Sequence, residues 1–505
     1  MRRTLLGNTA RLKQADPPKD RIRLFRFLAP VVAFALFGCA VEPDYVAPGL
    51  EVPAAFRASP ASAAAAWPGA GWWKGFGSPE LDGLIAAAQG GNFDIEAAMA
   101  RVRQADAQLG LAGAALLPTV NGSGSGQWSH STQRRIGGGV GVSGGGRTTE
   151  SRSFAASTSV SWELDFWGRV RANRDAAAAG ALASRFDQES VALTVVTAVA
   201  STWFQALALQ DRVDIAARNL ADAEAILRAI EARQSAGTAS GLDVAQQGAL
   251  VAGVRAQVPG LRSQLEQQIT ALGLLTGRPP SAVTVRPGTL NALALPEISP
   301  GLPSALLSRR PDIAEAEAQL IAANANIRVA RAAFFPQISL SGSAGWQGLA
   351  LGTLFGPGSL FANAGLSAAQ VIFDHGRLSA QSALMQARFD ELAALYRKAV
   401  VQGFTDVENA ARGYSFATEQ EELTRAAVAV AQLAADIASE QVRAGTSDVV
   451  RALQAQTTLF QDLDQLAQVR LARFQALLSL YKALGGGWAR EDVEAPALKL
   501  FQGVL

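Results

Sequence analysis

The chain has 505 residues, of which 17% are charged and 49% hydrophobic, and a formal net charge of +2 at pH 7. Residues 1–38 hold eight Lys or Arg and two Asp, a net of +6, so the rest carries 2 − 6 = −4 and gives no argument for a nucleic-acid partner. Two histidines and one cysteine leave little material for a metal or thiol site, so we expect no metal, no cofactor and no enzyme activity. No run of 18 apolar residues follows the N-terminal region, which argues against a transmembrane helix in the mature chain.

The first 38 residues predict a lipoprotein signal peptide. A basic segment precedes a short apolar run at 27–37, whose length suits a signal-peptide core and not a membrane span. The run leads into Leu36-Phe37-Gly38-Cys39, which matches a bacterial lipoprotein box, and Cys39 is the only cysteine. We therefore expect Cys39 to carry the acyl chains of a membrane anchor, with a plain signal peptide and an incidental cysteine as the alternative.

Two proline-free stretches of equal length organise the rest of the chain. Gly168–Gly237 and Gly376–Gly445 both begin with Gly-Arg and close on Ala-Gly-Thr, and 237 − 168 equals 445 − 376, or 69. Both are rich in Ala, Gln, Arg, Glu and Leu, which favour helices. A continuous helix of this length is about 100 Å long, which suits a tube, a stalk or a coiled coil and not a compact globule.

The protomer is therefore predicted to be internally duplicated. Ser240 with Asp243 resembles a capping box, and Pro259 predicts a kink or break in the helix that follows. The expected segments, in chain order, are the signal peptide at 1–38; an extended proline-rich tail at 39–80; a first repeat at 81–277, with a helix, a β-hairpin at 119–166, a long helix at 168–236 and a helix at 241–276; a proline-rich linker at 278–303; a second repeat at 304–488, with a helix, a β-hairpin at 337–373, a long helix at 376–444 and a helix at 448–484; and a C-terminal tail at 489–505.

Each repeat supplies one hairpin, so the chain has four predicted strands. Four strands cannot close a barrel, and an open sheet edge cannot lie in lipid. Three copies would supply about twelve strands, an even number that membrane barrels permit. The expected fold class is mainly α with a membrane β-barrel: a trimer with a 12-stranded outer-membrane barrel that continues into a long periplasmic α-helical barrel.

Several motifs together resemble the outer-membrane efflux protein family, the TolC-like outer membrane factors, and within it the NodT-type lipoprotein branch. The residues that carry this resemblance are Cys39-Ala40-Val41-Glu42-Pro43-Asp44-Tyr45, Trp72-Trp73, Trp162-Glu163-Leu164-Asp165-Phe166-Trp167-Gly168-Arg169, Arg309-Arg310-Pro311-Asp312-Ile313 and Leu480-Tyr481-Lys482-Ala483-Leu484-Gly485-Gly486-Gly487-Trp488. The resemblance implies a homotrimeric, lipid-anchored duct in the outer membrane that spans the periplasm. It also implies a periplasmic adaptor and an inner-membrane pump, often of the resistance-nodulation-division type, as partners, and the passive release of drugs or other small molecules.

By the same resemblance, the helix-turn-helix tips at 233–243 and 441–451 should contact the adaptor and narrow the tunnel. Arg233, Gly237 and Ser240 match the family's Arg-x-x-x-Gly-x-x-Ser tip pattern. The second tip has Gln441 where Arg is expected, so the corresponding candidates there are Arg443, Gly445 and Ser447.

The gate candidates lie within about two turns of each tip glycine. Relatives often place an acidic ring there, but the positions by spacing are Gln246 and Gln454, which carry no charge. Asp243, Asp448 and Arg451 are nearer candidates for a polar closure. Helix capping and solvated charge at the tips are the structural alternative for all of these residues.

Two other functions are compatible with long helices and a lipid anchor. A helical scaffold lipoprotein without a pore would keep all four strands out of lipid. A duct for type I protein secretion would share the architecture and differ only in its cargo.

Overall fold

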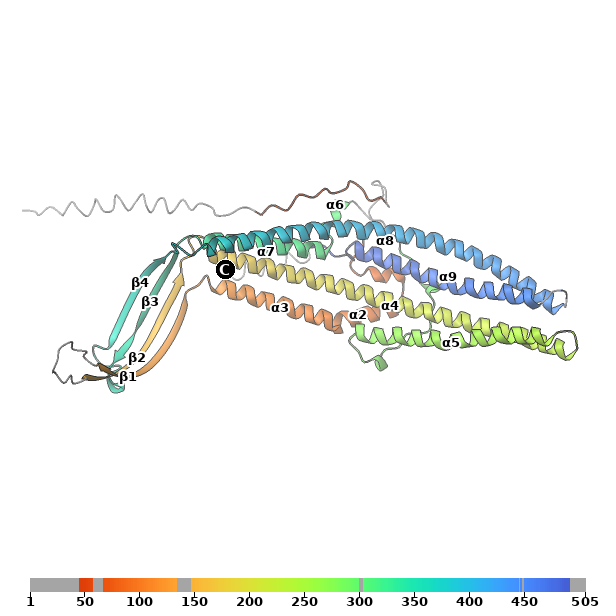
Figure 1. Ribbon diagram of the computed structural model, residues 1–505, viewed down its shortest axis with the longest axis horizontal. Helices are drawn as coiled ribbons and strands as arrows, with labels where there is room; N and C mark the ends of the chain where they lie inside the picture. Colours follow the sequence, from red (N-terminus) through yellow and green to blue (C-terminus); the bar gives the residue numbers. More distant parts are fainter. Residues whose placement is uncertain are drawn as a thin grey trace, which may run out of the picture. The chain divides into compact units, whose positions relative to one another are not determined.

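The computed structural model describes residues 45–57, 67–133, 147–298, 303–444, 446 and 449–490. The described chain forms two compact units, which are labelled by element in Figure 1. One contains 118–169 and 328–375; the other contains 45–117, 170–327 and 376–490. The predicted lipidation site Cys39 lies outside the described residues.

The first unit is built on a four-stranded antiparallel sheet with the order β1-β2-β3-β4 (Figure 1). Its strands are β1 (Thr119–Gln133), β2 (Arg147–Glu163), β3 (Gln337–Gly348) and β4 (Leu360–Ala369). The two hairpins, one from each repeat, join through β2 and β3, with Val160 opposite Gly342. Within the described part of the chain, β1 and β4 are the outer strands, and each has one edge without a strand partner.

The sheet is amphipathic, because most of its large apolar residues lie on one face and most of its serines on the other. Neighbours in register lie on the same face, and one face collects the large apolar residues Val120, Val160, Trp162, Leu340, Trp346, Leu360 and Leu366. The opposite face is rich in serine, with hydroxyl contacts of 3.0 Å between Ser123 and Ser157 and of 2.8 Å between Ser129 and Ser151. Leu360 and Leu366 are 66% and 69% exposed, so the described residues leave this part of the apolar face uncovered.

Helices dominate the second unit. The helices of the chain are α2 (Pro79–Gly91), α3 (Phe93–Ala114), α4 (Arg169–Ser235), α5 (Gly241–Leu275), α6 (Pro303–Leu306), α7 (Pro311–Ala332), α8 (Arg377–Arg443) and α9 (Val449–Ala483), with 3-10 turns η1 (Trp72–Phe76), η2 (Pro280–Ala282), η3 (Leu290–Ala292) and η4 (Leu351–Thr353). Side-chain caps mark several starts: Asn92 Oδ1 accepts the N–H groups of Asp94 and Ile95 at the beginning of α3. Helix α5 is unbroken at Pro259, so the break expected there does not occur.

The largest apolar core of this unit joins η1, α2, α4 and α9. Trp72 stacks on Tyr481 with ring centroids 4.5 Å apart, and Phe76 packs edge-on against Phe204 at 5.0 Å. One segment of α4 is long and apolar enough by composition to cross a membrane, but half of it is buried, and Val199 and Phe204 within it belong to this core. The high hydropathy of this segment of α4 is therefore explained by its place in the core of the unit.

The duplication extends to individual contacts. Asn92 Nδ2 donates 2.8 Å to the carbonyl oxygen of Leu275, and in the second repeat Arg310 Nη1 donates 3.3 Å to that of Ala483. Two glycines with positive φ, Gly277 and Gly485, follow those carbonyls. A Cβ on either would lie 1.8 Å from a main-chain oxygen, so only glycine fits.

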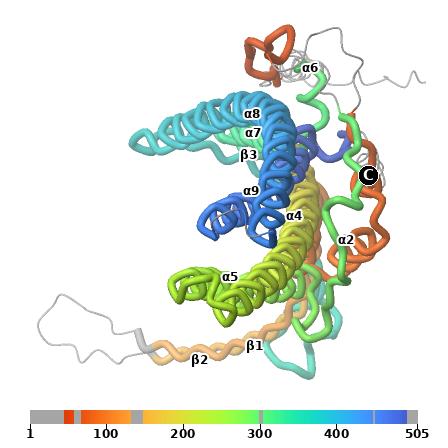
Figure 2. The backbone as a smooth tube through the Cα atoms, turned by 90° about the vertical axis from the view of Figure 1, so that its right-hand side faces the viewer, coloured from red at the N-terminus to blue at the C-terminus, as the bar shows by residue number. Residues whose placement is uncertain are grey.

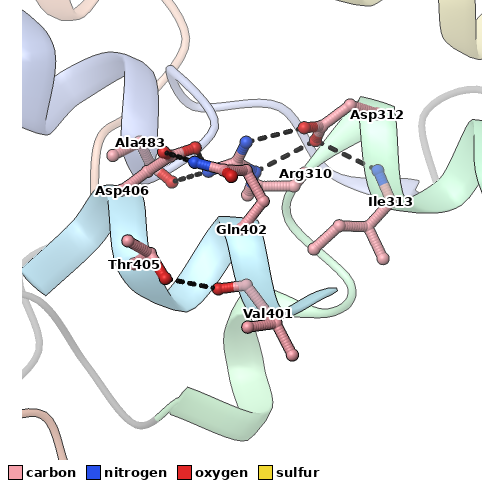
Figure 3. A network of polar contacts seen from close by, with 8 residues as sticks. All are labelled: Arg310, Asp312, Ile313, Val401, Gln402, Thr405, Asp406 and Ala483. Carbon is pink, nitrogen blue, oxygen red and sulfur yellow. Dashed lines mark hydrogen bonds and ion pairs between the residues drawn. The ribbon is translucent and has the colours of Figure 1, made fainter. Parts of the chain in front are cut away.

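Arg310 is the centre of a buried polar network (Figure 3). Its guanidinium donates to both carboxylate oxygens of Asp312 at 3.0 and 2.6 Å and to Asp406 at 2.9 Å. Gln402 also donates to Asp406 at 2.7 Å. The network joins the start of α7 to α8 and to the end of α9.

Candidate functional site: the helical tips

Four helices meet at the two tips that the sequence marks as candidates. Figure 2 looks along them, and in both Figure 1 and Figure 2 α9 and α4 lie between α8 and α5. Near the tips, the four helices share an apolar cluster around Ile230, Val442, Val449 and Ala452. The tips therefore form one packed site and not two separate hairpin ends.

Both tips close with the same backbone geometry. The N–H of Thr238 donates 2.8 Å to the carbonyl of Arg233, and that of Thr446 donates 2.9 Å to the carbonyl of Gln441. A hydrogen bond from an N–H group to the carbonyl five positions earlier is typical of a helix that ends in a residue with left-handed backbone conformation. Gly237 supplies that conformation in the first tip, with φ of 75°.

Arg233 ties the first tip to the second. Its Nη1 donates 3.1 Å to the carbonyl oxygen of Val442 on α8, and its Nη2 donates 3.4 Å to that of Thr238. Arg443 differs, because it forms an ion pair with Glu440 one turn earlier on the same helix, at 2.8 Å. Of the two arginines expected to contact the adaptor, only Arg233 has a described contact that bridges the tips.

Ser240 and Asp243 form a complete capping box at the start of α5. Asp243 N–H donates to Ser240 Oγ at 3.2 Å, and Ser240 N–H donates to Asp243 Oδ2 at 2.7 Å. The pKa of Asp243 is lowered by that backbone N–H and by the Ser240 hydroxyl. Asp243 is therefore a charged cap, which matches the structural alternative for this residue.

The two uncharged gate candidates come together. Gln246 and Gln454 each lie nine residues after their tip glycine, and both are exposed. They line one open groove of about 510 Å³ between α5 and α9, together with Val450, Leu453 and Thr457. Arg451 is exposed nearby, whereas Gly445, Ser447 and Asp448 lie outside the described residues.

A buried carboxylate farther from the tip is a feature that the sequence did not reveal. Glu421 on α8 is 2% exposed, and its Oε1 accepts from Arg425 and Arg470 at 2.7 and 2.9 Å. Its Oε2 accepts from Arg473 at 3.1 Å. Burial by itself raises the pKa of Glu421, but the hydrogen bonds from Arg473 and Arg470 outweigh it and the pKa is lowered. The only sequence signal was the local pairing with Arg425, four residues away.

Another ion pair joins the first repeat to the second. Arg212 on α4 binds both carboxylate oxygens of Asp464 on α9, at 2.6 and 3.1 Å. Both residues line an open groove of about 390 Å³ between α4, α5 and α9, with Asn219, Gln257 and Gln461 among its polar lining. Among the described residues, no group of three or more His, Cys, Asp or Glu is arranged to hold a metal ion.

Comparison with known proteins gives one consistent result. The family model described as "Outer membrane efflux protein" matches residues 84–278 and 302–486, one block in each repeat. The pyoverdine export outer membrane protein OpmQ of Pseudomonas aeruginosa is 40% identical over 466 residues, which cover 91% of this chain and 97% of that protein. The cation efflux system protein CusC of Escherichia coli K12 is 31% identical over 462 residues, covering 90% and 98%. The solved structure of the outer-membrane channel OprN superposes with a TM-score of 0.82 at 28% identity, covering 89% of this chain and 100% of that one.

Proposed function

The chain belongs to the outer membrane efflux protein family, and on that premise we propose that it is the duct through which small organic molecules leave a tripartite efflux system. It lies in the outer membrane and extends across the periplasm as a homotrimer. Its partners are a periplasmic adaptor protein and an inner-membrane pump. The pump is of the resistance-nodulation-division type, and the duct itself has no catalytic role.

The amphipathic, open-edged sheet is the observation that carries this proposal. Its uncovered apolar face suits lipid, and its serine-rich face suits a water-filled interior. The free edges of β1 and β4 would be unsatisfied in a bilayer unless neighbouring copies paired with them. Three copies of this four-stranded sheet give 3 × 4 = 12 strands, which close the barrel. A scaffold without a pore would leave the apolar face in water.

The cargo is proposed from the relatives. The most similar relative described above is named for pyoverdine export, and another protein of this family from Pseudomonas putida, 33% identical, is named for toluene efflux. These are small organic molecules of very different polarity, which fits a duct that does not select its cargo.

The tips are proposed as both the docking surface and the closure. Arg233, Gly237 and Ser240 on one tip and Arg443, Gly445 and Ser447 on the other would meet the adaptor. The opening would be narrowed by the charged side chains of Asp243, Asp448 and Arg451. The uncharged side chains of Gln246 and Gln454 would lie at a level farther from the tip glycines. Cys39 would carry the lipid that anchors each copy in the outer membrane.

Planar bilayers provide the direct test. Purified protein should form ion-conducting channels, and replacing Asp448 and Arg451 together by Ala should raise the single-channel conductance. An unchanged conductance would remove these two residues from the closure. A protein that does not conduct in either form, and whose strands remain accessible to soluble protease in outer-membrane vesicles, would instead be a scaffold.

A further inference from the structure

The connection between β3 and β4 exposes large apolar side chains. We call residues 349–359 the η4 loop, after the 3-10 turn within it. Leu349, Leu351 and Phe355 in this loop are 67–78% exposed. The loop contains no charged residue, and neither does the rest of 332–373, which includes both strands. Exposed apolar side chains that lie together mark a surface in contact with another molecule or a membrane.

The η4 loop satisfies many of its polar groups internally. The main-chain N–H groups of Thr353, Gly356 and Ser359 donate to carbonyl oxygens of the same loop at 3.1, 3.0 and 3.3 Å. Its two hydroxyl groups also point inward. Thr353 Oγ1 donates 3.1 Å to the carbonyl of Ala350, and Ser359 Oγ donates 2.7 Å to that of Gly356. A loop with internal hydrogen bonds loses less when it moves from water to the boundary of a bilayer.

The η4 loop packs against the apolar face of the sheet. The ring of Phe355 meets that of Trp346 edge-on, with centroids 5.4 Å apart, and Trp346 belongs to the apolar face. Leu354 is only 6% exposed, and a Cβ on Gly348 would lie 3.4 Å from its Cα. The contact with Trp346 therefore places Phe355 on the side of the sheet that we propose faces lipid, and not on the serine-rich side.

The lengths of the strands set the level of the loop. Strand β3 has 12 residues, and about 9–11 residues of a tilted strand cross a bilayer. Its end at Gly348 pairs with Phe154 on β2, and β2 continues for 154 − 147 = 7 residues beyond that point. This extension contains the exposed, charged residues Glu150 and Arg152. The first hairpin therefore extends past the η4 loop into water, whereas the second hairpin ends at the boundary of the bilayer.

The η4 loop lies at the end of the sheet that the proposed duct directs out of the cell, because the helices adjoin the other ends of the strands. We propose that it is a lipid anchor of the outer leaflet, with its backbone at the headgroup level and Leu349, Leu351 and Phe355 inserted among the acyl chains. Apolar side chains at such a boundary reach about 5–10 Å into it.

Lipid is the occupant for two reasons. The loop continues the apolar face of the sheet, and it has no charge at the level where the first hairpin becomes charged. Three such loops in a trimer would fix the depth of the barrel in the membrane. The inference rests on the proposed duct, whose barrel defines the side that faces lipid.

A fluorescent label at single introduced cysteines tests the surroundings of the loop. Leu351→Cys places the polarity-sensitive label NBD on the loop, and Leu366→Cys places it on the apolar face of β4. Thr148→Cys is the control in water, because this exposed position lies on β2 six residues beyond Phe154 and on the same face. The unmodified chain, whose only cysteine is Cys39, measures background labelling.

The labelled proteins are reconstituted in phosphatidylcholine vesicles and quenched from two sides. A nitroxide on the lipid acyl chain quenches labels in lipid, and iodide quenches labels in water. Because lipid surrounds an apolar barrel surface, acyl-chain quenching at Leu351 should be about three-fold or more stronger than at Thr148 and similar to that at Leu366. Iodide quenching should follow the opposite order.

Three results would contradict the anchor. Strong iodide quenching at Leu351, with acyl-chain quenching at Leu366, would overturn the anchor and leave the barrel intact. Protection of Leu351 from both quenchers would also overturn it, because protein and not lipid would then cover the loop. Absence of acyl-chain quenching at Leu366 would count against the membrane barrel of the duct itself, and the anchor would fall with it.

A charge in the loop tests whether its apolar side chains hold it in lipid. The label is placed by Leu349→Cys, and Leu351→Glu is added. Acyl-chain quenching of the label should fall by about half or more, because a charged side chain is costly to place among acyl chains. Leu351→Met, which keeps an apolar side chain of similar volume, is the control and should preserve the quenching. Conductance in planar bilayers checks that both variants keep the barrel, and equal quenching in the two would overturn the anchor.

Discussion

Arg233 donates a hydrogen bond of 3.1 Å to the carbonyl oxygen of Val442, and this contact ties the tip of the first repeat to the tip of the second. The sequence marked Arg233 through a motif that it shares with other exit ducts, but its partner is 209 residues away. The structure therefore gives the residue a specific mechanical role. It holds two pairs of helices together at the end that we propose closes the duct.

Replacing Arg233 by Ala should loosen the tips. A hydrogen bond from a charged donor contributes about 1.5–3 kcal/mol, so its loss shifts the equilibrium toward the open state by a factor of about ten or more. We expect a higher single-channel conductance or a longer open time in planar bilayers. Arg443→Ala is the control, because the ion pair of Arg443 with Glu440 stays within one helix. Equal effects of the two substitutions would show that the cross-tip contact does not hold the duct closed.

Arg310→Ala should destabilise the folded protein strongly. The substitution leaves Asp312 and Asp406 without their shared cation and the carbonyl of Ala483 without its donor. Removing one partner of a buried ion pair costs about 3–5 kcal/mol. Asn92→Ala removes the equivalent neutral contact in the first repeat together with the side-chain cap of α3, and should still cost less, about 2 kcal/mol. Thermal unfolding of the two purified variants compares them, and a smaller loss for Arg310→Ala would contradict the central role of its network.

Glu421 should make stability depend on acid pH. Its pKa is lowered in the folded protein, so its stabilisation is fully present above its ordinary pKa of 4.5 and is lost as the pH falls through the lowered value. The melting temperature of the unmodified protein should fall in that window. Glu421→Gln should melt lower at neutral pH, because Arg470 and Arg473 lose their carboxylate, and its curve should be flatter in acid. Parallel curves for the two proteins would exclude Glu421 as the titrating group.

Glu315 should have the opposite effect. Burial, and then the nearby carboxylates of Asp187 and Asp312, raise its pKa to about 7. The folded state therefore holds a proton that the unfolded state releases, and stability falls as the pH rises from 4.5 to about 7. Glu315→Gln keeps the neutral form at every pH, so we expect a higher melting temperature at pH 8 and little change at pH 4. A variant that melts lower at pH 8 would contradict the raised pKa of Glu315.

The sequence by itself determined the duplication, the mainly helical class with four strands, and the family, because these depend on local signals. A stretch that is rich in helix-forming residues and free of proline predicts a long helix whatever its tertiary neighbours are. A stretch in which apolar and small polar residues alternate predicts a strand in the same way. The same signals located the capping box of Ser240 and Asp243, whose two members are three residues apart. Pro259 illustrates the limit of a local rule, because α5 continues through it and the break that it could have caused does not occur.

The tertiary structure alone decided which segments meet. No local pattern pairs β2 with β3, joins Arg310 to Asp406, or surrounds Glu421 with Arg470 and Arg473, because each of these contacts joins residues 49 or more positions apart in the chain. The same holds for Phe416, Leu423, Val430 and Ile437, whose seven-residue spacing is visible in the sequence but whose exposure is decided by the fold. Periodicity fixes the direction in which side chains point, whereas packing decides what they reach.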